Sequence, residues 1–382
     1  MIRVRGDDEL RARMARTPSA SPEDARRTNR SLVLRALHLG GPASRAGLAK
    51  LIRVTPATVS SVVRELVDEE IVEELGRSEE RNVGKPATLV GIRSDGRNIA
   101  SIDLSSHDEL VGALIDLDGK VVARHRIERH GAVAADLLVL VRELFAELVG
   151  AAQRPLLGVG VATPGYVEAS GIVATATRLH WERVDVAREL SAIGPAPVHV
   201  VNDANAAALA ELTYGDGDNQ DLVVVRIDEG VGAGLVLDGT LHIGRAGGGG
   251  ELGHVVLDPN GAPCECGKRG CLETFVSAPL IEHRLRHDVG AEPDGSVIVD
   301  AGRALGQGLA LLLSALDVAH VVVSGTEEVL SEPFRAAVHE VVAARTLPDF
   351  ARRLAIRESS FHDHDVLLGA AALVLDRELG IR

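Results

Sequence analysis

The chain has 382 residues, of which 46% are hydrophobic and 25% charged, and its net charge is -14. That length leaves room for two or three packed domains, and no uninterrupted apolar run approaches the roughly 18 residues that a membrane span needs. Charged residues interrupt the amino-terminal segment, which therefore lacks the apolar stretch of a secretory signal. These features argue against a membrane or secreted protein, and we expect a globular protein of the cytoplasm.

The charge is distributed unevenly along the chain. Over residues 1–64 there are 13 basic and 5 acidic side chains, whereas the remaining residues contain 28 basic and 50 acidic ones. A basic segment is the part of an acidic protein that can approach nucleic-acid phosphates. The amino-terminal segment is therefore the predicted DNA-facing region, with a solvated arginine-rich tail as the alternative that charge alone leaves open.

Apolar spacing predicts three short helices after a flexible basic arm at residues 1–27. The first helix is expected over residues 28–39, where apolar side chains recur at helical spacing before a Gly-Gly-Pro break. Ser44 is a suitable N-cap for the second helix, and Thr55 followed by Pro56 is a strong start for the third. Valine and leucine residues form the apolar face of this third helix, which leaves its small polar residues on another face.

The small polar face of the third helix and the segment after it suit DNA. Hydroxyl side chains with one arginine allow close approach to phosphates and base edges in a major groove. Two strands with a basic tip are expected over residues 73–77 and 84–90. Together these elements predict a winged helix-turn-helix domain over residues 28–92, with a small helical protein-interaction module as the alternative. The predicted DNA-binding residues are Thr55, Ala57, Thr58, Ser60, Ser61, Arg64, Arg77, Arg81 and Lys85.

All three cysteines of the chain fall in one short window. Cys264, Cys266 and Cys271 have the spacing Cys-x-Cys-x4-Cys, separated by glycines that allow a tight loop, and His254 lies upstream. Three thiolates and one further ligand would complete a tetrahedral structural zinc site. A disulfide and a reduced loop without metal are the alternatives, and an odd number of cysteines in an untargeted chain argues against the disulfide.

The same region resembles the signature of the ROK family, named for repressors, open reading frames and kinases. Glu251-Leu252-Gly253-His254 followed by Cys264-x-Cys-Gly-x-x-Gly-Cys271-x-Glu273 is similar to the paired family motif, and weaker similarity extends from about Arg26 to the end of the chain. The resemblance implies an α/β, bilobal body of the actin/hexokinase-like (ribonuclease H-like) type over residues 93–382. Lobe one would contain about 93–200 plus the C-terminal helix, and lobe two about 201–360.

By the same resemblance, a sugar cleft lies between the lobes and one of its walls is braced by zinc. Residues 159–165 resemble the family's turn over the sugar, and residues 200–208 resemble its Asn-Asp turn. Sugar recognition requires polar groups that pair hydroxyls in a cleft closed to water. The implied sugar-binding residues are Asn202, Asp203, Glu251, His254, Glu273 and Gly165, and the implied zinc ligands are His254, Cys264, Cys266 and Cys271.

Phosphoryl transfer would also require loops that cradle ATP phosphates with backbone N–H groups. Where the family kinases have Asp-x-Gly-Gly-Thr, residues 103–107 read Asp-Leu-Ser-Ser-His. Where they have Gly-Thr-Gly, this chain has Asp228-Glu229-Gly230, and the adenosine-side Gly-Gly becomes Ser324-Gly325-Thr326. The carboxylates of the second loop would repel a triphosphate. We therefore expect no enzymatic activity, and Asp203, which matches the base of the kinases, would be vestigial.

The sequence thus predicts a sugar-responsive transcriptional regulator, a repressor of carbohydrate uptake or catabolism genes. Its expected partners are double-stranded operator DNA, a sugar or sugar-derivative effector and a second copy of the chain. A homodimer is expected because one recognition helix reads only one half-site. The alternatives are an active ROK hexose kinase with a DNA-binding arm, and an interaction protein that holds a partner through its kinase-like body.

Overall fold

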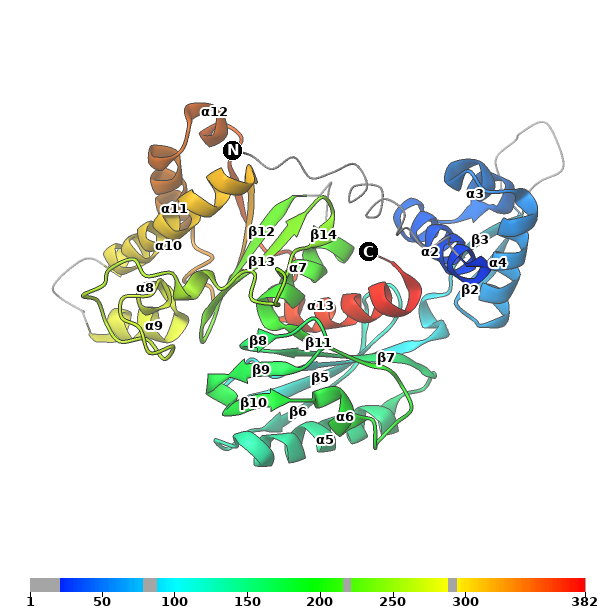
Figure 1. Cartoon of the computed structure of the whole chain (residues 1–382), viewed down its shortest axis with the longest axis horizontal. Helices are drawn as coiled ribbons and strands as arrows, with labels where there is room; N and C mark the ends of the chain where they lie inside the picture. The colour runs from blue at the N-terminus through cyan, green and yellow to red at the C-terminus, as the bar shows by residue number, and fades with distance from the viewer. Residues whose placement is uncertain (1–20, 78–87, 216–220, 288–293, 382) are drawn as a thin grey trace, which may run out of the picture. The chain divides into compact units, whose positions relative to one another are not determined.

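The computed structural model describes residues 21–77, 88–215, 221–287 and 294–381. These residues divide into two compact units (Figure 1). The smaller unit comprises the chain up to Arg93 together with Leu379–Ile381, and the larger unit extends from Ser94 to Glu378. The division at Arg93 lies beside the end expected for the amino-terminal domain at residue 92.

The described residues of the smaller unit form three helices and a three-stranded sheet of order β1-β3-β2. Ser44 and Thr55 are confirmed as N-caps, because their hydroxyl oxygens accept hydrogen bonds from the Gly47 and Thr58 N–H groups at 3.0 and 3.2 Å. The elements are α2 (Pro22–Gly40), β1 (Ala43–Ser44), α3 (Arg45–Ile52), α4 (Pro56–Asp68), β2 (Val72–Arg77) and β3 (Thr88–Ile92).

Helix α2 begins at Pro22 and not at residue 28, so the end of the segment expected to be a flexible arm is helical. A capping box explains the early start. The Ser21 hydroxyl accepts from the Asp24 N–H, and the Asp24 carboxylate accepts from the Ser21 N–H, both at 3.1 Å. Residues 22–27 contain almost no large apolar side chain, so hydrophobic periodicity alone missed this part of the helix.

The expected hairpin is formed by β2 and β3, which pair antiparallel with a bulge between Glu74 and Gly76. Its tip, with the predicted contacts Arg81 and Lys85, lies outside the described residues. Strand β1, which pairs with β3, was not predicted. Apolar side chains from all three helices and β3 fill the core below this sheet, namely Val33, Leu34, Leu37, Leu48, Val59, Val62, Val63, Leu66 and Val90.

The first large sheet of the larger unit has the order β11-β7-β4-β5-β6. Helix α5 packs on β5 and β6, while α13 packs on β4, β7 and β11, and the two helices lie on opposite sides of the sheet (Figure 1). The elements are η1 (Ser94–Gly96), β4 (Asn98–Asp103), β5 (Glu109–Ile115), β6 (Val121–Glu128), α5 (Ala134–Ala151), β7 (Leu156–Thr163), β11 (Val198–Asn202) and α13 (Asp365–Val374).

A small antiparallel sheet, β10-β9-β8, follows the end of β7. It carries Trp181, whose ring is buried and whose indole N–H donates to the Ala134 carbonyl oxygen at 3.0 Å. Its elements are β8 (Tyr166–Val167), β9 (Val173–Ala176), η2 (Thr177–Leu179), β10 (Trp181–Val184) and the following helix α6 (Val186–Leu190).

The second large sheet has the order β14-β13-β12-β15-β16. Helix α7 packs on β12 and β13 and also against α13, so these two helices meet between the large sheets. Its elements are α7 (Asp203–Tyr214), β12 (Leu222–Ile227), β13 (Val231–Leu237), β14 (Thr240–Leu241), β15 (His320–Gly325), α11 (Glu332–Arg345), α12 (Pro348–Ala351) and β16 (Ala355–Glu358). The remaining elements are η3 (Leu252–His254), α8 (Glu273–Val276), α9 (Ala278–His287), α10 (Asp294–Leu316), η4 (His362–His364) and the π-helical turn η5 (Leu375–Leu379).

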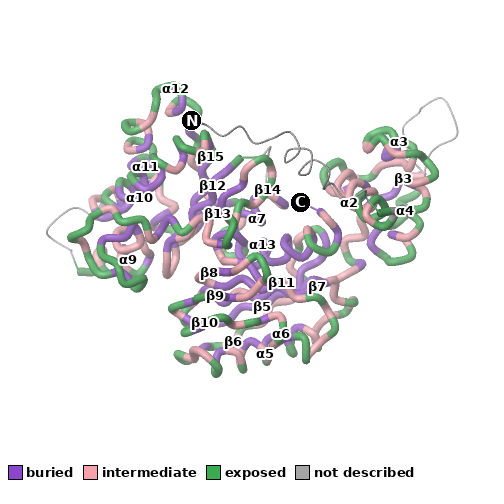
Figure 2. The backbone as a smooth tube through the Cα atoms, viewed as in Figure 1, coloured by how far each residue is buried: buried purple, intermediate pink, exposed green. Residues whose placement is uncertain are grey.

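The central strands of both large sheets are buried (Figure 2). Among the described residues, one segment, Ser296–Leu316 of α10, is long and apolar enough to cross a membrane, and 56% of it is buried within the protein. Its Leu305, Leu309 and Leu313 belong to the apolar core of the second sheet. Core helices of soluble proteins share this length and composition, so the segment is weak evidence for a membrane span.

Candidate sugar and metal site

A pocket of about 120 Å³ in the larger unit gathers all six residues predicted to bind sugar. This volume is below the range of roughly 300–1,000 Å³ that is usual for drug-sized ligands, so it suits a small polar molecule. The six residues that line it are Gly165, Asn202, Asp203, Glu251, His254 and Glu273. Segments that lie far apart in the sequence therefore meet as the motifs implied.

Asn202 and Gly165 shape the turn at one side of the pocket. Asn202 ends β11 and is the N-cap of α7, because its Oδ1 accepts from the Asn205 N–H at 3.1 Å. Its Nδ2 donates to the Gly165 carbonyl oxygen at 2.9 Å. Gly165 has a φ of +89°, and a Cβ there would lie 2.3 Å from the Thr175 carbonyl oxygen, so only glycine fits. Asn202 and Gly165 therefore fix the conformation of the backbone that borders the pocket.

Asp203 begins α7 and is mostly buried, with 17% of its side chain exposed. The pKa of Asp203 is raised to about 6, chiefly by burial. The charge of Arg226 lowers this pKa, whereas the charges of Asp103 and Asp228 raise it. Desolvation favours the neutral carboxyl, whereas a cation at hydrogen-bond distance favours the carboxylate. The protonation state of this group therefore depends on its arginine neighbour.

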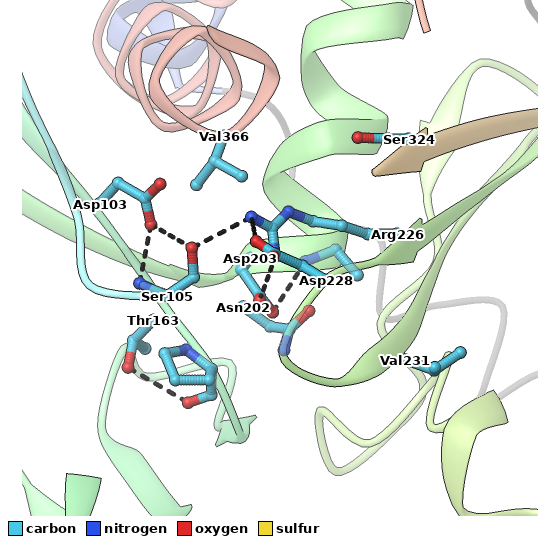
Figure 3. Close-up of polar contacts among 12 residues, drawn as sticks. Asp103, Ser105, Thr163, Asn202, Asp203, Arg226, Asp228, Val231, Ser324 and Val366 are labelled. Atoms are coloured by element: carbon cyan, nitrogen blue, oxygen red, sulfur yellow. Dashed lines mark hydrogen bonds and ion pairs between the residues drawn. The ribbon is translucent and has the colours of Figure 1, made fainter. Parts of the chain in front are cut away.

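That arginine, Arg226, is a pocket residue that the motifs did not reveal. Its Nη1 donates to Asp203 Oδ2 at 3.2 Å, and its Nη2 donates to Asp228 Oδ2 at 2.7 Å and to Ser105 Oγ at 3.2 Å (Figure 3). Burial opposes its charge, but Asp203, Asp228 and other nearby carboxylates outweigh this effect and raise the pKa of Arg226. The sequence signal was present, since Arg226 is the charged residue of the strand Leu-Val-Val-Val-Arg-Ile.

Glu251, His254 and Glu273 form the opposite side of the pocket. Glu251 is the N-cap of the short turn η3 and His254 is its last residue, with Glu251 Oε2 3.9 Å from His254 Nε2. Burial raises the pKa of Glu251, although His254 lowers it. Glu273 Oε2 accepts from the Val231 N–H at 3.1 Å, and its Oε1 lies 3.6 Å from Arg178 Nη2. Arg178, which sequence reasoning also missed, lines the same pocket.

The four predicted metal ligands lie together beside this side of the pocket. The ligand atoms of His254, Cys264, Cys266 and Cys271 all fall within 4.8 Å of one another. The distance from Cys264 Sγ to His254 Nδ1 is 3.6 Å, and the distance from Cys266 Sγ to Cys271 Sγ is also 3.6 Å. Four tetrahedral ligands with metal–sulfur bonds of about 2.3 Å would be separated by about 3.8 Å. This cysteine–histidine cluster therefore fits a metal ion, with His254 Nδ1 toward the thiols and Nε2 toward Glu251.

Backbone contacts hold the cysteine loop in a tight fold. The Cys264 N–H donates to the Lys268 carbonyl oxygen, and the Gly267 N–H donates to that of Cys264, both at 2.9 Å. Gly270 has a φ of +63°, and a Cβ there would lie 1.6 Å from the Asp258 carbonyl oxygen. Glycine is required at this position because the two backbone segments approach so closely.

The segments that resemble nucleotide loops also surround Arg226. Asp103 Oδ1 accepts from both the N–H and the hydroxyl of Ser105, at 2.8 and 2.6 Å. Ser324, in the third segment, donates its hydroxyl to the buried Asp365. Two of the three altered segments thus supply partners to the Arg226 guanidinium, namely Ser105 and Asp228.

In the smaller unit, α4 presents a face of predicted DNA contacts. Thr55, Ala57, Ser61 and Arg64 are exposed, whereas Thr58 and Ser60 are half-buried. The Thr55 and Thr58 hydroxyls are 2.9 Å apart, so these two residues also serve the helix start. Arg77 ends β2, beside the undescribed tip.

The architecture and the site define a protein with a two-sheet α/β body, a small polar pocket and an adjacent cysteine–histidine cluster. The profile of the ROK family matches residues 99–377. The chain belongs to the ROK family.

Named relatives cover nearly the whole chain. The xylose repressor of Bacillus subtilis strain 168 is 26% identical over 375 residues, which cover 93% of this chain and 96% of that protein. The DNA-binding transcriptional dual regulator NagC of Escherichia coli strain K12 is 27% identical over 375 residues, covering 91% of this chain and 92% of NagC.

Solved structures agree with the fold. A ROK family transcriptional regulator, described as a homolog of the E. coli MLC protein, has a TM-score of 0.81 at 27% identity and covers 94% of this chain and 98% of that one. A ROK family glucokinase from Streptomyces griseus, in complex with glucose and AMPPNP, has a TM-score of 0.64 at 22% identity and covers 72% of this chain. The mixed α/β body is thus similar to that of ROK kinases, as the motifs implied, while the regulator covers both units.

Proposed function

We propose that this protein is a sugar-responsive DNA-binding transcriptional regulator, a repressor of carbohydrate uptake or catabolism genes. The observation that carries the proposal is the pocket, in which six predicted sugar-binding residues from separate stretches of the sequence meet around a space of about 120 Å³. The relatives named xylose repressor and NagC support the regulatory role. The pocket is the sensor in this proposal, and the smaller unit is the reader.

The smaller unit acts as a winged helix-turn-helix. Helices α3 and α4 form the helix-turn-helix, and the β2–β3 hairpin forms the wing. The exposed polar side chains of α4 would enter a major groove, where an arginine such as Arg64 contacts phosphate or base edges. One such helix reads one half-site, so the regulator would bind a two-fold operator as a homodimer.

The cysteine–histidine cluster would hold a structural zinc ion. Its ligand set and separations suit a closed tetrahedral site. A zinc ion bound there would cross-link the cysteine loop and the turn that carries His254. Because His254 would bind zinc through Nδ1, its Nε2 remains directed to the pocket side, where it would contact a sugar hydroxyl.

The body would sense sugar without phosphorylating it. The carboxylates of Asp228 and Glu229 lie at the pocket, Glu229 in its lining and Asp228 on the Arg226 guanidinium. Negative charge at this position disfavours a triphosphate. Asp203, the counterpart of the kinase base, is itself paired with Arg226. The rival function, an active hexose kinase, has support from the kinase neighbours of the fold.

A two-part experiment tests the proposal. Thermal-shift assays would use xylose, glucose, N-acetylglucosamine and the 6-phosphates of the last two, because a ligand of the folded state raises its melting temperature. Gel-shift titrations on DNA upstream of the protein's own gene would follow, with and without each sugar. We expect specific DNA binding that a stabilising sugar changes by at least about tenfold. Turnover of ATP with any of these sugars would instead establish the kinase, and failure to bind DNA would refute the regulator.

A further inference from the structure

Arg226 lies in a strand whose other side chains are apolar and buried. Strand β12 pairs with β13 on one side and β15 on the other, so it is central in its sheet. Only 13% of the Arg226 side chain is exposed. A charged group at such a position costs stability unless partners compensate its desolvation. The partners of this guanidinium should therefore reveal its role.

Four carboxylates surround the Arg226 guanidinium, each from a different segment. Asp203 begins α7 and Asp228 follows β12, and both are hydrogen-bonded to it. Asp103 ends β4 and Asp365 begins α13, and both raise the pKa of Arg226 through their charge. One cation thus neutralises part of a cluster that holds four acids.

The guanidinium also joins the two large sheets at the pocket. Asp203 and Ser105 follow strands β11 and β4 of the first sheet, whereas Arg226 and Asp228 belong to the second. Figure 3 shows the guanidinium between the Ser105 loop and the paired carboxylates. Ser105, Asp203 and Arg226 all line the pocket. Residues of this ion-pair network from both sheets therefore line the ligand space.

The charge of Arg226 favours the carboxylate form of Asp203. The pKa of Asp203 is about 6 with Arg226 present, and Arg226 is the largest influence that lowers it. Without the guanidinium, burial and the charges of Asp103 and Asp228 would raise the pKa further. The protonated form of Asp203 would then be favoured, and a protonated carboxyl is a weaker acceptor than a carboxylate.

We propose that Arg226 is a positioning residue of the sugar pocket, which holds Asp203 as a carboxylate that accepts a hydrogen bond from one ligand hydroxyl. Its guanidinium also links the two sheets where Arg226 lines the pocket. The nature of the ligand rests on the proposed function, but the ionic role of Arg226 does not. Arg226 acts through Asp203 and needs no contact with the ligand.

A ligand-free experiment tests the ionic role. Melting temperatures between pH 5 and 8 would be compared for the wild type, Arg226→Lys, Arg226→Met and Arg226→Met with Asp203→Asn. An acid whose folded pKa is raised stabilises the protein at low pH, and this stability is lost as pH rises through the folded pKa. Arg226→Met should therefore lose about 10 °C at pH 8 and much less at pH 5.

The other two variants separate charge from packing. Arg226→Lys keeps a cation and should retain most of the wild-type stability at every pH. Asp203→Asn in the Arg226→Met background removes one buried acid and should reduce the added pH dependence. A pH-independent loss of equal size in Arg226→Lys and Arg226→Met would overturn the proposal, because packing alone would then explain the residue.

The ligand experiment measures affinity against pH for whichever of xylose, glucose and N-acetylglucosamine stabilises the wild type. At pH 7, Arg226→Met should bind about tenfold or more weakly, and its affinity should recover as pH rises and Asp203 ionises. Wild-type affinity at pH 7 in Arg226→Met would overturn the positioning role. If a sugar binds but DNA binding fails, the proposed function falls while this inference stands.

Discussion

The two units of the molecule place their polar groups in opposite ways. In the smaller unit, ion pairs such as Arg26–Glu65 and Arg45–Glu74, at 2.9 and 2.8 Å, lie at the surface over an apolar core. Among the described residues, the buried polar side chains all belong to the larger unit. They are Asn98, Ser101, Ser105, Asp116, Arg129, Thr163, Asn205, Glu211, Thr213, Ser324, Ser359 and Asp365.

From this difference we infer which residues of each unit are available for binding: exposed ones in the smaller unit and pocket residues in the larger one. Surface ion pairs contribute little to stability, so the exposed polar residues of the smaller unit can serve a partner. Buried polar groups are costly unless paired. In the larger unit, the buried Ser105 lines the pocket, and the buried Asp365 lies close enough to act on Arg226 through its charge. Function should therefore be separable by mutation, with sensing changed in one unit and DNA binding in the other.

The largest expected effect is the loss of metal. Cys266→Ser should reduce zinc from about one ion per chain to almost none and destabilise the larger unit by about 4 kcal/mol or more, because metal sites are among the costliest features to lose. It should also abolish sugar binding, because the proposed zinc ion would fix the turn that carries His254. Metal analysis, calorimetry and sugar titration check these outcomes.

The matched control is Lys268→Ala in the same loop. Lys268 is exposed, and its backbone serves the fold of the loop: its carbonyl accepts from the Cys264 N–H, and its own N–H hydrogen-bonds to the Cys266 thiol, so both contacts survive replacement by alanine. Removal of the Lys268 side chain should change neither the zinc content nor the melting temperature. A folded Cys266→Ser protein that still binds sugar with wild-type affinity would show that the pocket does not depend on the metal.

The next effect is confined to the pocket. Glu251→Ala should weaken sugar binding by about tenfold to a hundredfold, since it removes a charged hydrogen-bond acceptor, and it should abolish the sugar response in gel shifts. Affinity for operator DNA without sugar should stay unchanged, because Glu251 belongs to the larger unit. Asp203→Ala should lose the sugar response in the same way.

Glu282→Ala is the control, as Glu282 is an acidic residue of α9 outside the pocket lining, paired with Arg286. A full sugar response in Glu251→Ala would show that the pocket has been assigned wrongly. A large loss of DNA affinity in this variant would contradict the separation of the two functions.

A reverse effect is expected in the reader. Arg64→Ala, or Lys85→Ala at the predicted wing tip, should weaken DNA binding while sugar affinity remains unchanged. Loss of a phosphate contact reduces the salt slope by about one unit, whereas loss of a base contact costs about 1–3 kcal/mol at one operator position. Gel shifts at several salt concentrations distinguish the two.

Arg303→Ala provides the comparison for these reader variants, because it removes a half-exposed arginine of α10 in the larger unit. It should leave DNA binding intact. If Arg64→Ala and Lys85→Ala both keep wild-type affinity and salt dependence, the reader assignment is wrong.

The two units also differ in how far the sequence predicted them. Periodicity and N-caps predicted α3 and α4, and two segments on either side of a basic tip predicted the hairpin. Neither signal predicted the extension of α2 to Pro22, which depends on a polar capping box. In the larger unit, motifs predicted the pocket and the cysteine–histidine cluster, which the structure brings together. Arg226 was missed because its partners come from several segments, most of them distant, and only the folded chain shows their proximity.

The smallest expected effect separates helix capping from DNA contact within the smaller unit. Ser44 and Thr55 are both N-caps, but only Thr55 is a predicted DNA contact. Replacing either with alanine should destabilise the protein by about 1 kcal/mol, the usual cost of losing a cap. Thr55→Ala should in addition weaken DNA binding, whereas Ser44→Ala should not, and Thr55→Ser should restore stability because serine caps equally well. Chemical denaturation followed by gel shifts on the same samples measures both quantities. Equal DNA affinity in Ser44→Ala and Thr55→Ala would mean that Thr55 serves only the helix start, and the contact face of α4 would then begin at Ala57.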